Sequence, residues 1–276
     1  MKYRLVASDF DDTLYPAKLK KVSDFTLNTV KRFIAAGGIF VIVTGRMFAA
    51  IIKQADKLGL EGYIISYQGA LISDIRSRKT VKAFNMPHDL ALEYIAFLKD
   101  YPVKALQVYM DDVLHIERRN QYTDFYCNYC DIEAVETGDM TEFIKNHPEK
   151  RIHKVYVAVS PEVTETLRTA AENKFGDRLL INKSTEFNVE AVVSSTSKGK
   201  ALAFIAEKYG IAREEILAFG DQLNDLTLLE YAGTGVAVAN GSELLKSKAD
   251  AVCPSAEEDG VAKTILKLCL EEEYDD

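Results

Sequence analysis

Short apolar runs alternate with helical patterns in the first part of the chain. Residues 5–7, 39–43 and 63–66 are mainly apolar, as expected for buried parallel strands. Between the first two runs, apolar residues recur at helical spacing from Ser23 until Gly37, where a left-handed helix end is expected. Another helical segment separates the second run from the third. This β-α-β-α-β order predicts a Rossmann-like, doubly wound parallel sheet in an α/β fold.

The middle of the chain has a different pattern. Residues 83–188 contain shorter strand-like runs, such as 105–109 and 153–159, with helical segments between them. After this region the first pattern returns, with a further helix and further apolar runs. We therefore expect a core domain formed by residues 1–82 and 189–276, with an inserted α+β domain at residues 83–188.

The composition narrows the class of protein. The chain has 276 residues, enough for one large domain or two ordinary ones, and 47% hydrophobic residues provide ample core material. A net charge of −8 argues against binding to the phosphate backbone of nucleic acids. No apolar run approaches the length of a membrane span, and the N-terminus does not resemble a signal peptide. We expect a cytoplasmic protein without nucleic-acid or membrane partners, and the sequence implies no protein partner.

Cys127 and Cys130 form a C-x-x-C pair within an aromatic segment. A redox or zinc site would need a second ligand pair, or a thioredoxin-like strand before the motif, and neither is visible. The favoured interpretation is a half-buried helix with two ordinary thiols, although the pair leaves the alternatives open.

Polar side chains stand at the ends of three apolar runs. Asp9 and Asp11 follow the first run, Thr44 follows the second, and Asp221 follows the run at residues 216–219. Ligands of open α/β sheets bind outside the carboxyl ends of the strands, so we expect these side chains to lie close together. Asp11 lies two residues beyond Asp9 and is a candidate general acid and base. Each residue alone is also explained by an ordinary turn or helix cap, so the prediction depends on their conjunction.

This set of residues suits phosphoryl transfer assisted by a metal ion. Asp9 is a candidate nucleophile, and the carboxylates of Asp9 and Asp221 are candidate ligands of Mg²⁺, which prefers oxygen. Lys198, at a predicted helix start, would add positive charge against a phosphate. Thr44 could donate its hydroxyl, and Gly45 allows the backbone to approach closely.

In their order along the chain, these residues resemble the motifs of the haloacid dehalogenase superfamily, and specifically those of its Cof-type phosphatases. The four matching segments are Asp9-Phe10-Asp11-Asp12-Thr13-Leu14, Val43-Thr44-Gly45-Arg46, Ser197-Lys198-Gly199 and Gly220-Asp221-Gln222-Leu223-Asn224-Asp225. The resemblance spans nearly the whole chain. It implies a Rossmann-like core with a large cap inserted between the second and third segments.

The resemblance also implies a role for each matching residue. By it, Asp9 is the nucleophile and Asp11 the general acid and base, while Asp9, the backbone carbonyl of Asp11 and Asp221 bind Mg²⁺. The full candidate set is Asp9, Asp11, Asp221 and Asp225 for the metal; Thr44, Gly45, Lys198 and Asn224 for phosphate; and Arg46, Gln68 and Gly69 for the substrate.

Two of the positions that depart from the family pattern bear on the substrate. Gln68 stands where relatives often carry Asn, and Asp12 stands where Gly is common. Neither position belongs to the catalytic set, but both leave the substrate contacts open.

We predict a Mg²⁺-dependent hydrolase that removes phosphate from small phosphorylated metabolites through an aspartyl-phosphate intermediate. Sugar phosphates are the leading substrate class, with pyridoxal phosphate and flavin mononucleotide as further classes implied by the resemblance. A phosphomutase and a non-catalytic sugar-phosphate sensor are the alternatives. A second non-catalytic alternative is a signalling switch with a phosphorylatable aspartate. Asp11 argues against this switch, because a durable phosphoaspartate gains nothing from an acid and base two residues away.

Overall fold

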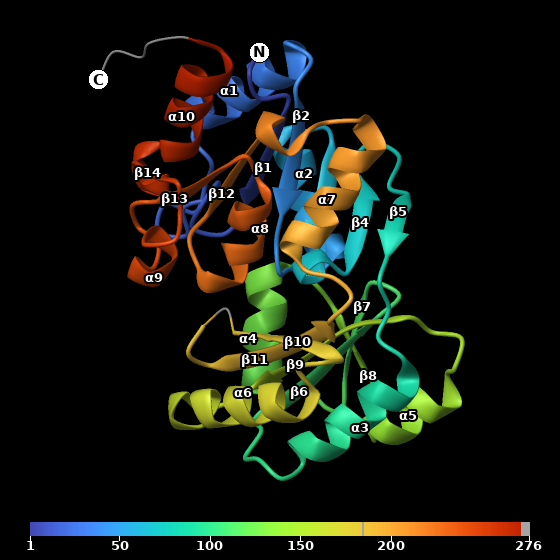
Figure 1. The fold of residues 1–276 in the computed structure, drawn as a ribbon. Helices are drawn as coiled ribbons and strands as arrows, with labels where there is room; N and C mark the ends of the chain where they lie inside the picture. The colour runs from blue at the N-terminus through green and yellow to red at the C-terminus, as the bar shows by residue number, and fades with distance from the viewer. Residues whose placement is uncertain (184, 272–276) are drawn as a thin grey trace.

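The strands of the chain form two sheets in this computed structural model, which describes residues 1–183 and 185–271 (Figure 1). The core sheet has the strand order β14-β13-β12-β1-β2-β3-β4-β5, and the cap sheet has the order β10-β11-β9-β6-β7-β8. The core elements are β1 (Leu5–Asp9), α1 (Asp24–Ala35), β2 (Ile39–Val43), α2 (Phe48–Leu58), β3 (Tyr63–Ser66), β4 (Leu71–Asp74), β5 (Thr80–Ala83), α7 (Lys198–Tyr209), β12 (Ile216–Gly220), α8 (Leu226–Tyr231), β13 (Thr234–Val238), α9 (Glu243–Lys246), β14 (Ala251–Cys253) and α10 (Gly260–Cys269). The cap elements are α3 (His88–Leu98), β6 (Ala105–Met110), β7 (Val113–Ile116), α4 (Gln121–Cys130), β8 (Ala134–Glu136), α5 (Met140–Asn146), β9 (Ile152–Ala158), α6 (Pro161–Phe175), β10 (Leu179–Asn182) and β11 (Asn188–Val193).

The core sheet is parallel except at one edge. Strands β14, β13, β12, β1, β2 and β3 run parallel to one another, while β4 and β5 add an antiparallel hairpin. Successive side chains of a strand point to opposite faces, and both faces of this sheet are covered by helices. Helices α1, α2 and α10 pack on one face, and α7, α8 and α9 pack on the other. The prediction of a Rossmann-like parallel core with an inserted α+β cap is confirmed.

The first helix shows how local sequence sets an element. The Ser23 side chain accepts a hydrogen bond from the backbone N–H of Thr26 (3.0 Å), which caps the start of α1. The helix ends before Gly37, whose φ of 91° favours glycine. Val30 and Phe33 are buried against the sheet. The cap and the spacing of apolar residues were both visible in the sequence.

The end of the cap differs from the predicted boundary. Residue 188 is the first residue of β11, and β11 pairs with β9 and β10 in the cap sheet as far as Val193. We therefore propose a cap formed by residues 84–193. The sequence pattern could not place this boundary, because an apolar strand carries no sign of which sheet it joins.

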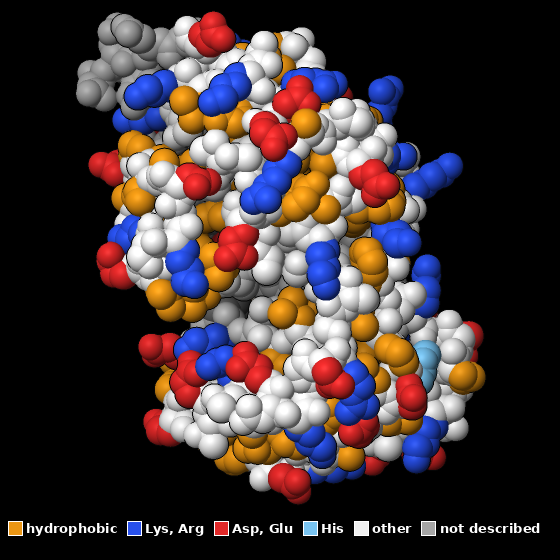
Figure 2. All heavy atoms as spheres, viewed as in Figure 1, with side chains coloured by type: hydrophobic (Ala, Val, Ile, Leu, Met, Phe, Trp, Pro, Cys, Tyr) orange, Lys and Arg blue, Asp and Glu red, His pale blue; other side chains and the backbone are white. Residues whose placement is uncertain are grey.

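The surface of the molecule carries charges of both signs. On the face shown in Figure 2, lysine, arginine and acidic side chains are interspersed, and the surface is indented where the core and the cap meet. None of the described helices has the length and apolar character needed to span a membrane.

Candidate active site

Three strand ends bring the predicted residues together. Strand β1 lies between β12 and β2, and all three run in the same direction. Asp9 is the last residue of β1, Thr44 directly follows β2, and Asp221 directly follows β12. The carboxyl ends of adjacent parallel strands lie at the same edge of a sheet, so these residues share one edge.

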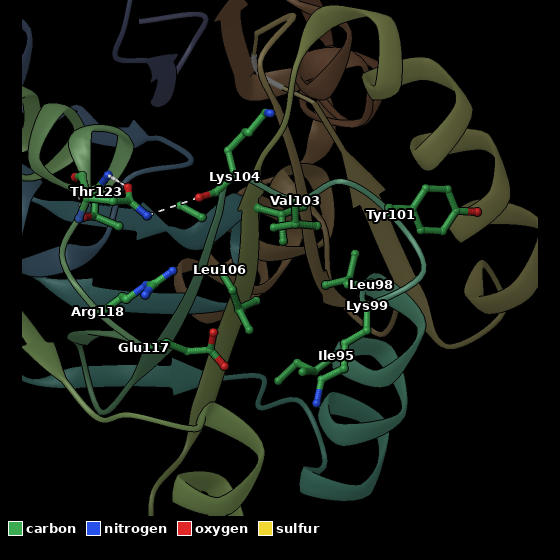
Figure 3. A pocket seen from close by; sticks show the side chains of 13 residues that line it. Ile95, Leu98, Lys99, Tyr101, Val103, Lys104, Leu106, Glu117, Arg118 and Thr123 are labelled. Atoms are coloured by element: carbon green, nitrogen blue, oxygen red, sulfur yellow. Dashed lines mark hydrogen bonds between the residues drawn. The ribbon is translucent and has the colours of Figure 1, made fainter.

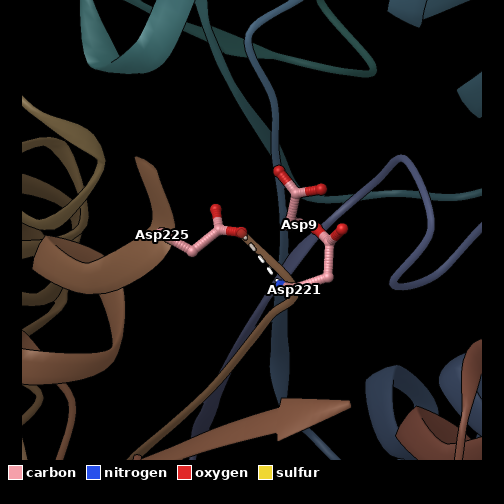
Figure 4. Close-up of side chains that lie close together, drawn as sticks. All are labelled: Asp9, Asp221 and Asp225. Carbon is pink, nitrogen blue, oxygen red and sulfur yellow. Dashed lines mark hydrogen bonds between the residues drawn. The ribbon is translucent and has the colours of Figure 1, made fainter. Parts of the chain in front are cut away.

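Three of the carboxylates converge at this edge (Figure 4). Asp9, Asp221 and Asp225 are buried, and each offers a carboxylate oxygen within 4.8 Å of the other two. Asp225 is anchored by backbone N–H groups, since its Oδ2 accepts from the amides of Asp221 (3.0 Å) and Gln222 (3.2 Å). This anchoring fixes Asp225 against the turn that carries Asp221.

A buried cation faces the cluster. Lys198 is 1% exposed and stands at the start of α7, where Ser197 supplies the helix cap. Its Nζ donates to Asp9 Oδ1 at 2.6 Å and also to Asp225 Oδ1. Burial alone would lower the pKa of Lys198, but the charges of Asp225 and Asp9 outweigh burial and raise this pKa. The lysine therefore remains charged between the two carboxylates.

One cation does not neutralise three buried carboxylates. Burial, followed by the charge of Asp225, raises the pKa of Asp9 well above its usual range, although Lys198 opposes this shift. The same two causes raise the pKa of Asp221 to about 7. Both carboxyls therefore need a proton or a further cation to be stable in this environment.

The donor atoms of the cluster fit a small divalent cation. They are all carboxylate oxygens, which suit Mg²⁺ or Ca²⁺ rather than the softer metals that prefer sulfur or imidazole. Both oxygens of Asp225 already accept hydrogen bonds, so Asp225 orients the cluster, whereas Asp9 and Asp221 are better placed to bind the ion. Within the part of the chain that the structure describes, this is the one such group of His, Cys, Asp or Glu side chains.

Asp11, two residues beyond Asp9, is paired with Arg46. Its two oxygens accept hydrogen bonds from Arg46 Nε (2.9 Å) and a terminal nitrogen of Arg46 (2.5 Å). The Arg46 guanidinium also lies over the ring of Tyr129 from the cap helix α4, 4.9 Å from the ring centroid. The Tyr129 hydroxyl lies 3.4 Å from Asp11. Asp11 is therefore held by Arg46, and its Oδ2 keeps a lone pair for a further contact.

Gln68 joins two further predicted site residues, Gly45 and Asn224. The Gln68 side chain accepts a hydrogen bond from Asn224 Nδ2 (3.2 Å), and a Cβ at Gly45 would lie 2.5 Å from Gln68 Nε2. Gly69 has a φ of 108°, and a Cβ there would lie 2.4 Å from the carbonyl oxygen of Ser197. Gly69 therefore allows the segment before Lys198 to pack closely against the turn after β3.

The sequence matches the haloacid dehalogenase-like hydrolase family over residues 6–265. The chain belongs to this family. The predicted membership, and the prediction that the chain is an enzyme of the hydrolase class, are confirmed.

Individual relatives match over nearly their whole length. The pyridoxal phosphate phosphatase YbhA of Escherichia coli is 27% identical over 284 residues, covering 96% of this chain and 98% of that protein. The 5-amino-6-(5-phospho-D-ribitylamino)uracil phosphatase YitU of Bacillus subtilis is 28% identical over 264 residues, covering 94% and 95%. The crystal structure of a protein from Thermotoga maritima superposes with a TM-score of 0.81 and 26% sequence identity. The match covers 96% of this chain and 97% of that chain. A haloacid dehalogenase-like hydrolase from B. subtilis, 24% identical with a TM-score of 0.87 and coverage of 96% and 99%, shares the fold.

Sequence reasoning missed the cap residues that reach the site of this hydrolase. Lys154 on β9 and Glu190 on β11 form a buried ion pair (2.8 Å) that contacts the core at Gly45 and Gln68. The signal was present, because each is the single Lys, Arg, Asp or Glu within a mainly apolar strand. Its interpretation required the pairing of β9 with β11, which brings the two side chains to the same face.

The C-x-x-C pair plays no visible part in the site. Cys127 and Cys130 lie on α4 as buried free thiols. Burial raises the pKa of both thiols, so neither has the thiolate character of a reactive cysteine.

A cavity of about 330 Å³ lies elsewhere, at one end of the cap sheet (Figure 3). Its lining includes Lys99, Lys104 and Arg118 over apolar side chains such as Leu106. None of the predicted site residues lines it. Arg119, which follows Arg118, turns instead to Asp124 and Glu133 in ion pairs of 3.3 and 3.2 Å.

Proposed function

We propose that this hydrolase is a Mg²⁺-dependent phosphatase of small phosphorylated metabolites. The observation that carries the proposal is the cluster of Asp9, Asp221 and Asp225 closed by Lys198 at the carboxyl edge of the parallel sheet. A phosphate dianion is repelled by a bare carboxylate, so a nucleophilic aspartate needs nearby cations. Mg²⁺ bound by Asp9 and Asp221 would neutralise charge on the phosphoryl group and orient it.

The chain's own groups account for both halves of the reaction. A carboxylate oxygen of Asp9 attacks phosphorus while the bond to the leaving oxygen breaks, which gives an aspartyl phosphate. Asp11 gives its proton to the leaving oxygen, then takes a proton from a water molecule that attacks the same phosphorus. This second step releases phosphate and regenerates the Asp9 carboxylate. Lys198 and Thr44 hold phosphoryl oxygens throughout.

Sugar phosphates are the substrate class that we propose first. The named relatives act on pyridoxal phosphate and on a ribityl phosphate attached to a uracil, so the proposal also covers phosphate esters of small ring compounds. We keep the cytoplasm as the proposed location, a proposal supported by the four free cysteines.

The proposal is tested by phosphate release from a panel of phosphorylated metabolites, with Mg²⁺ and with EDTA. Wild type, Asp9→Asn and the exposed control Glu149→Gln are compared. We expect Mg²⁺-dependent release by wild type and the control, and none by Asp9→Asn. A folded wild type that releases phosphate from no compound would reject the proposal in favour of a mutase or a sensor.

A further inference from the structure

The loop after β2 is held by both domains. The carbonyl oxygens of Thr44 and Arg46 accept hydrogen bonds from backbone amides of the core segment Tyr67–Gly69, at 3.1 and 3.0 Å. The carbonyl of Gly45, between them, accepts from Lys154 Nζ of the cap at 2.8 Å. The core therefore fixes the two outer peptides of this loop, whereas the cap fixes the middle one.

Lys154 has little freedom to make this contact in another way. It is 2% exposed, and its Nζ also donates to Glu190 Oε2 at 2.8 Å. The rings of Tyr109 and Tyr156 lie around the ammonium group, with centroids 4.8 and 5.7 Å from Nζ. A buried ammonium without its acceptors is strongly disfavoured, so the packed cap keeps Lys154 on the Gly45 carbonyl.

One peptide unit connects the Lys154 contact to the Thr44 hydroxyl, the proposed phosphate ligand. The peptide between Gly45 and Arg46 is planar, so fixing its carbonyl also fixes its N–H. That N–H, of Arg46, donates to Thr44 Oγ1 at 3.1 Å. A hydroxyl that already accepts one hydrogen bond keeps its own proton for another acceptor, such as a phosphoryl oxygen.

The same ion pair reaches a second candidate phosphate contact. Glu190 Oε1 accepts from Gln68 Nε2 at 2.5 Å, and Gln68 in turn accepts from Asn224 Nδ2 at 3.2 Å. Asn224 Oδ1 is buried and has no hydrogen-bond partner among the described residues. The side chain of Asn224 is therefore oriented from the cap as well.

We propose that Lys154 is a positioning residue, which completes the phosphate-binding loop from the cap by orienting the peptide between Gly45 and Arg46. The inference rests on the proposed function, because it takes Thr44 as a contact of the phosphoryl group. Packing of the cap onto the core then does more than enclose the substrate: it sets the geometry of the loop that holds the transferred group.

The test removes the contact without leaving a buried charge unpaired. In the double variant Lys154→Met with Glu190→Gln, both charges are replaced by side chains of similar size. We expect kcat to fall by about 10²-fold, the scale of a small misplacement of reacting groups. The factor should be the same for every substrate, since all share the phosphoryl group. Calorimetry with Mg²⁺ should also show weaker binding of inorganic phosphate.

Two further variants define what would overturn the proposal. Asp112→Asn alters a different buried contact between cap and core and is expected to change kcat by less than about threefold. Glu190→Gln alone leaves Lys154 in contact with the Gly45 carbonyl. Its kcat should therefore stay at least about tenfold higher than that of the double variant. Equal losses in Glu190→Gln and the double variant would assign the role to Glu190. A loss confined to some substrates would make Lys154 a leaving-group contact, and a folded double variant with wild-type kcat and phosphate affinity would also overturn the proposal.

The same measurements distinguish a variant that fails to fold from a failure of the proposed function. If the double variant does not fold, Lys154→Leu with Glu190→Met tests the same contact with apolar side chains among the tyrosine rings. If wild type turns over no substrate, the proposed function fails, but the ratio of phosphate affinities still tests Lys154. A folded wild type that neither turns over a substrate nor binds phosphate overturns both proposals.

Discussion

At the scale of single residues, the site is defined by a shortage of positive charge. Lys198 is shared between Asp9 and Asp225, and among the described residues no lysine or arginine forms an ion pair with Asp221. Burial, followed by repulsion from Asp225, raises the pKa of Asp9 and that of Asp221. Such an arrangement costs stability and is typical of sites that bind a cation or carry out chemistry.

Asp9→Asn should abolish turnover, because an amide cannot attack phosphorus to form the covalent intermediate. We expect a loss on the order of 10⁴-fold or more, as for removal of other enzymatic nucleophiles. Steady-state phosphate release gives the rate, and circular dichroism with urea denaturation checks that the fold is retained. Retention of more than a small fraction of activity would assign the nucleophile elsewhere.

Asp11→Asn should reduce kcat by roughly 10²–10⁴-fold, the usual contribution of a general acid and base. The asparagine can still contact Arg46, so the loss reports proton transfer more than local packing. The effect should be smaller for substrates with good leaving groups, such as aryl phosphates, because these need less protonation. An unchanged rate with a poor leaving group would contradict the role of Asp11.

At the scale of the elements, a residue of the cap lies at the start of a core helix. Met47 precedes α2 and makes no side-chain capping bond. The carboxyl of Asp112, in the turn between β6 and β7, accepts from the Tyr67 hydroxyl at 2.6 Å, and the backbone amides of Ala49 and Phe48 oppose the rise in its pKa. The cap therefore places a carboxyl against the first turn of α2, whose amides have no partner within the helix.

Asp112→Ala should destabilise the protein by about 1–3 kcal/mol near pH 5, because the carboxyl against the first turn of α2 and the acceptor of a buried hydroxyl are both lost. Burial raises the pKa of Asp112 to about 6 from an unfolded value near 3.8. The stabilising contribution of the protonated folded state is thus full below the unfolded pKa and is lost as the pH rises through about 6.

The destabilisation by Asp112→Ala should accordingly shrink between about pH 5 and about pH 7.5. Urea denaturation of wild type and variant at both pH values measures the difference. Val113→Ala, at the start of β7 next to Asp112, is the control and should show no such dependence. A destabilisation that grows with pH would show that the carboxylate, rather than the carboxyl, is the preferred form.

Local sequence patterns were sufficient to predict the core sheet and its strand ends, but not the contacts between the core and the cap. Strand ends at Asp9, Thr44 and Asp221 could be predicted because each apolar run stops in a polar turn, and parallel topology then brings the ends together. The contacts of Lys154 and Asp112 depend on how the two domains pack, which no pattern along one strand encodes. The pairing of Asp11 with Arg46 lies within the core, and the sequence did not show it because the pattern of residues does not specify the direction of either side chain.

At the scale of the whole molecule, core and cap share an apolar cluster next to the site. Met47, Ala50 and Leu71 of the core pack there with Leu114 and Val192 of the cap. Apolar burial of this kind is non-directional, whereas the buried polar contacts of Lys154 and Asp112 require one orientation. Apolar burial therefore stabilises the packing of the cap on the core, and the polar contacts determine its orientation.

Mg²⁺ should stabilise the protein more strongly as the pH rises. The pKa of Asp221 is about 7 without the ion, so protons compete with the metal below this value. Without the ion, the stability linked to this carboxyl is lost as the pH rises through 7, and a bound cation would restore it. We expect apparent Mg²⁺ affinity to increase roughly tenfold from about pH 6 to about pH 8.

Thermal unfolding with a Mg²⁺ titration at both pH values measures this change in affinity. The pH-dependent stabilisation should disappear in Asp221→Asn and persist in Glu149→Gln. Equal stabilisation at the two pH values, or stabilisation retained in Asp221→Asn, would contradict the assignment of Asp221 as a ligand.

The insertion of the cap also dictates an order of events during synthesis. Strand β1, which carries Asp9, pairs on one side with β2 and on the other with β12, so that Leu5 lies beside Ile216. On the ribosome, the nascent chain must expose that second edge until the cap and β12 have emerged. Open apolar strand edges recruit other chains, and contacts between distant residues form slowly. A cap that folds early would shorten this interval by bringing β5 and α7 together, so the domain above the active site would also act as a folding guide for the sheet beneath it.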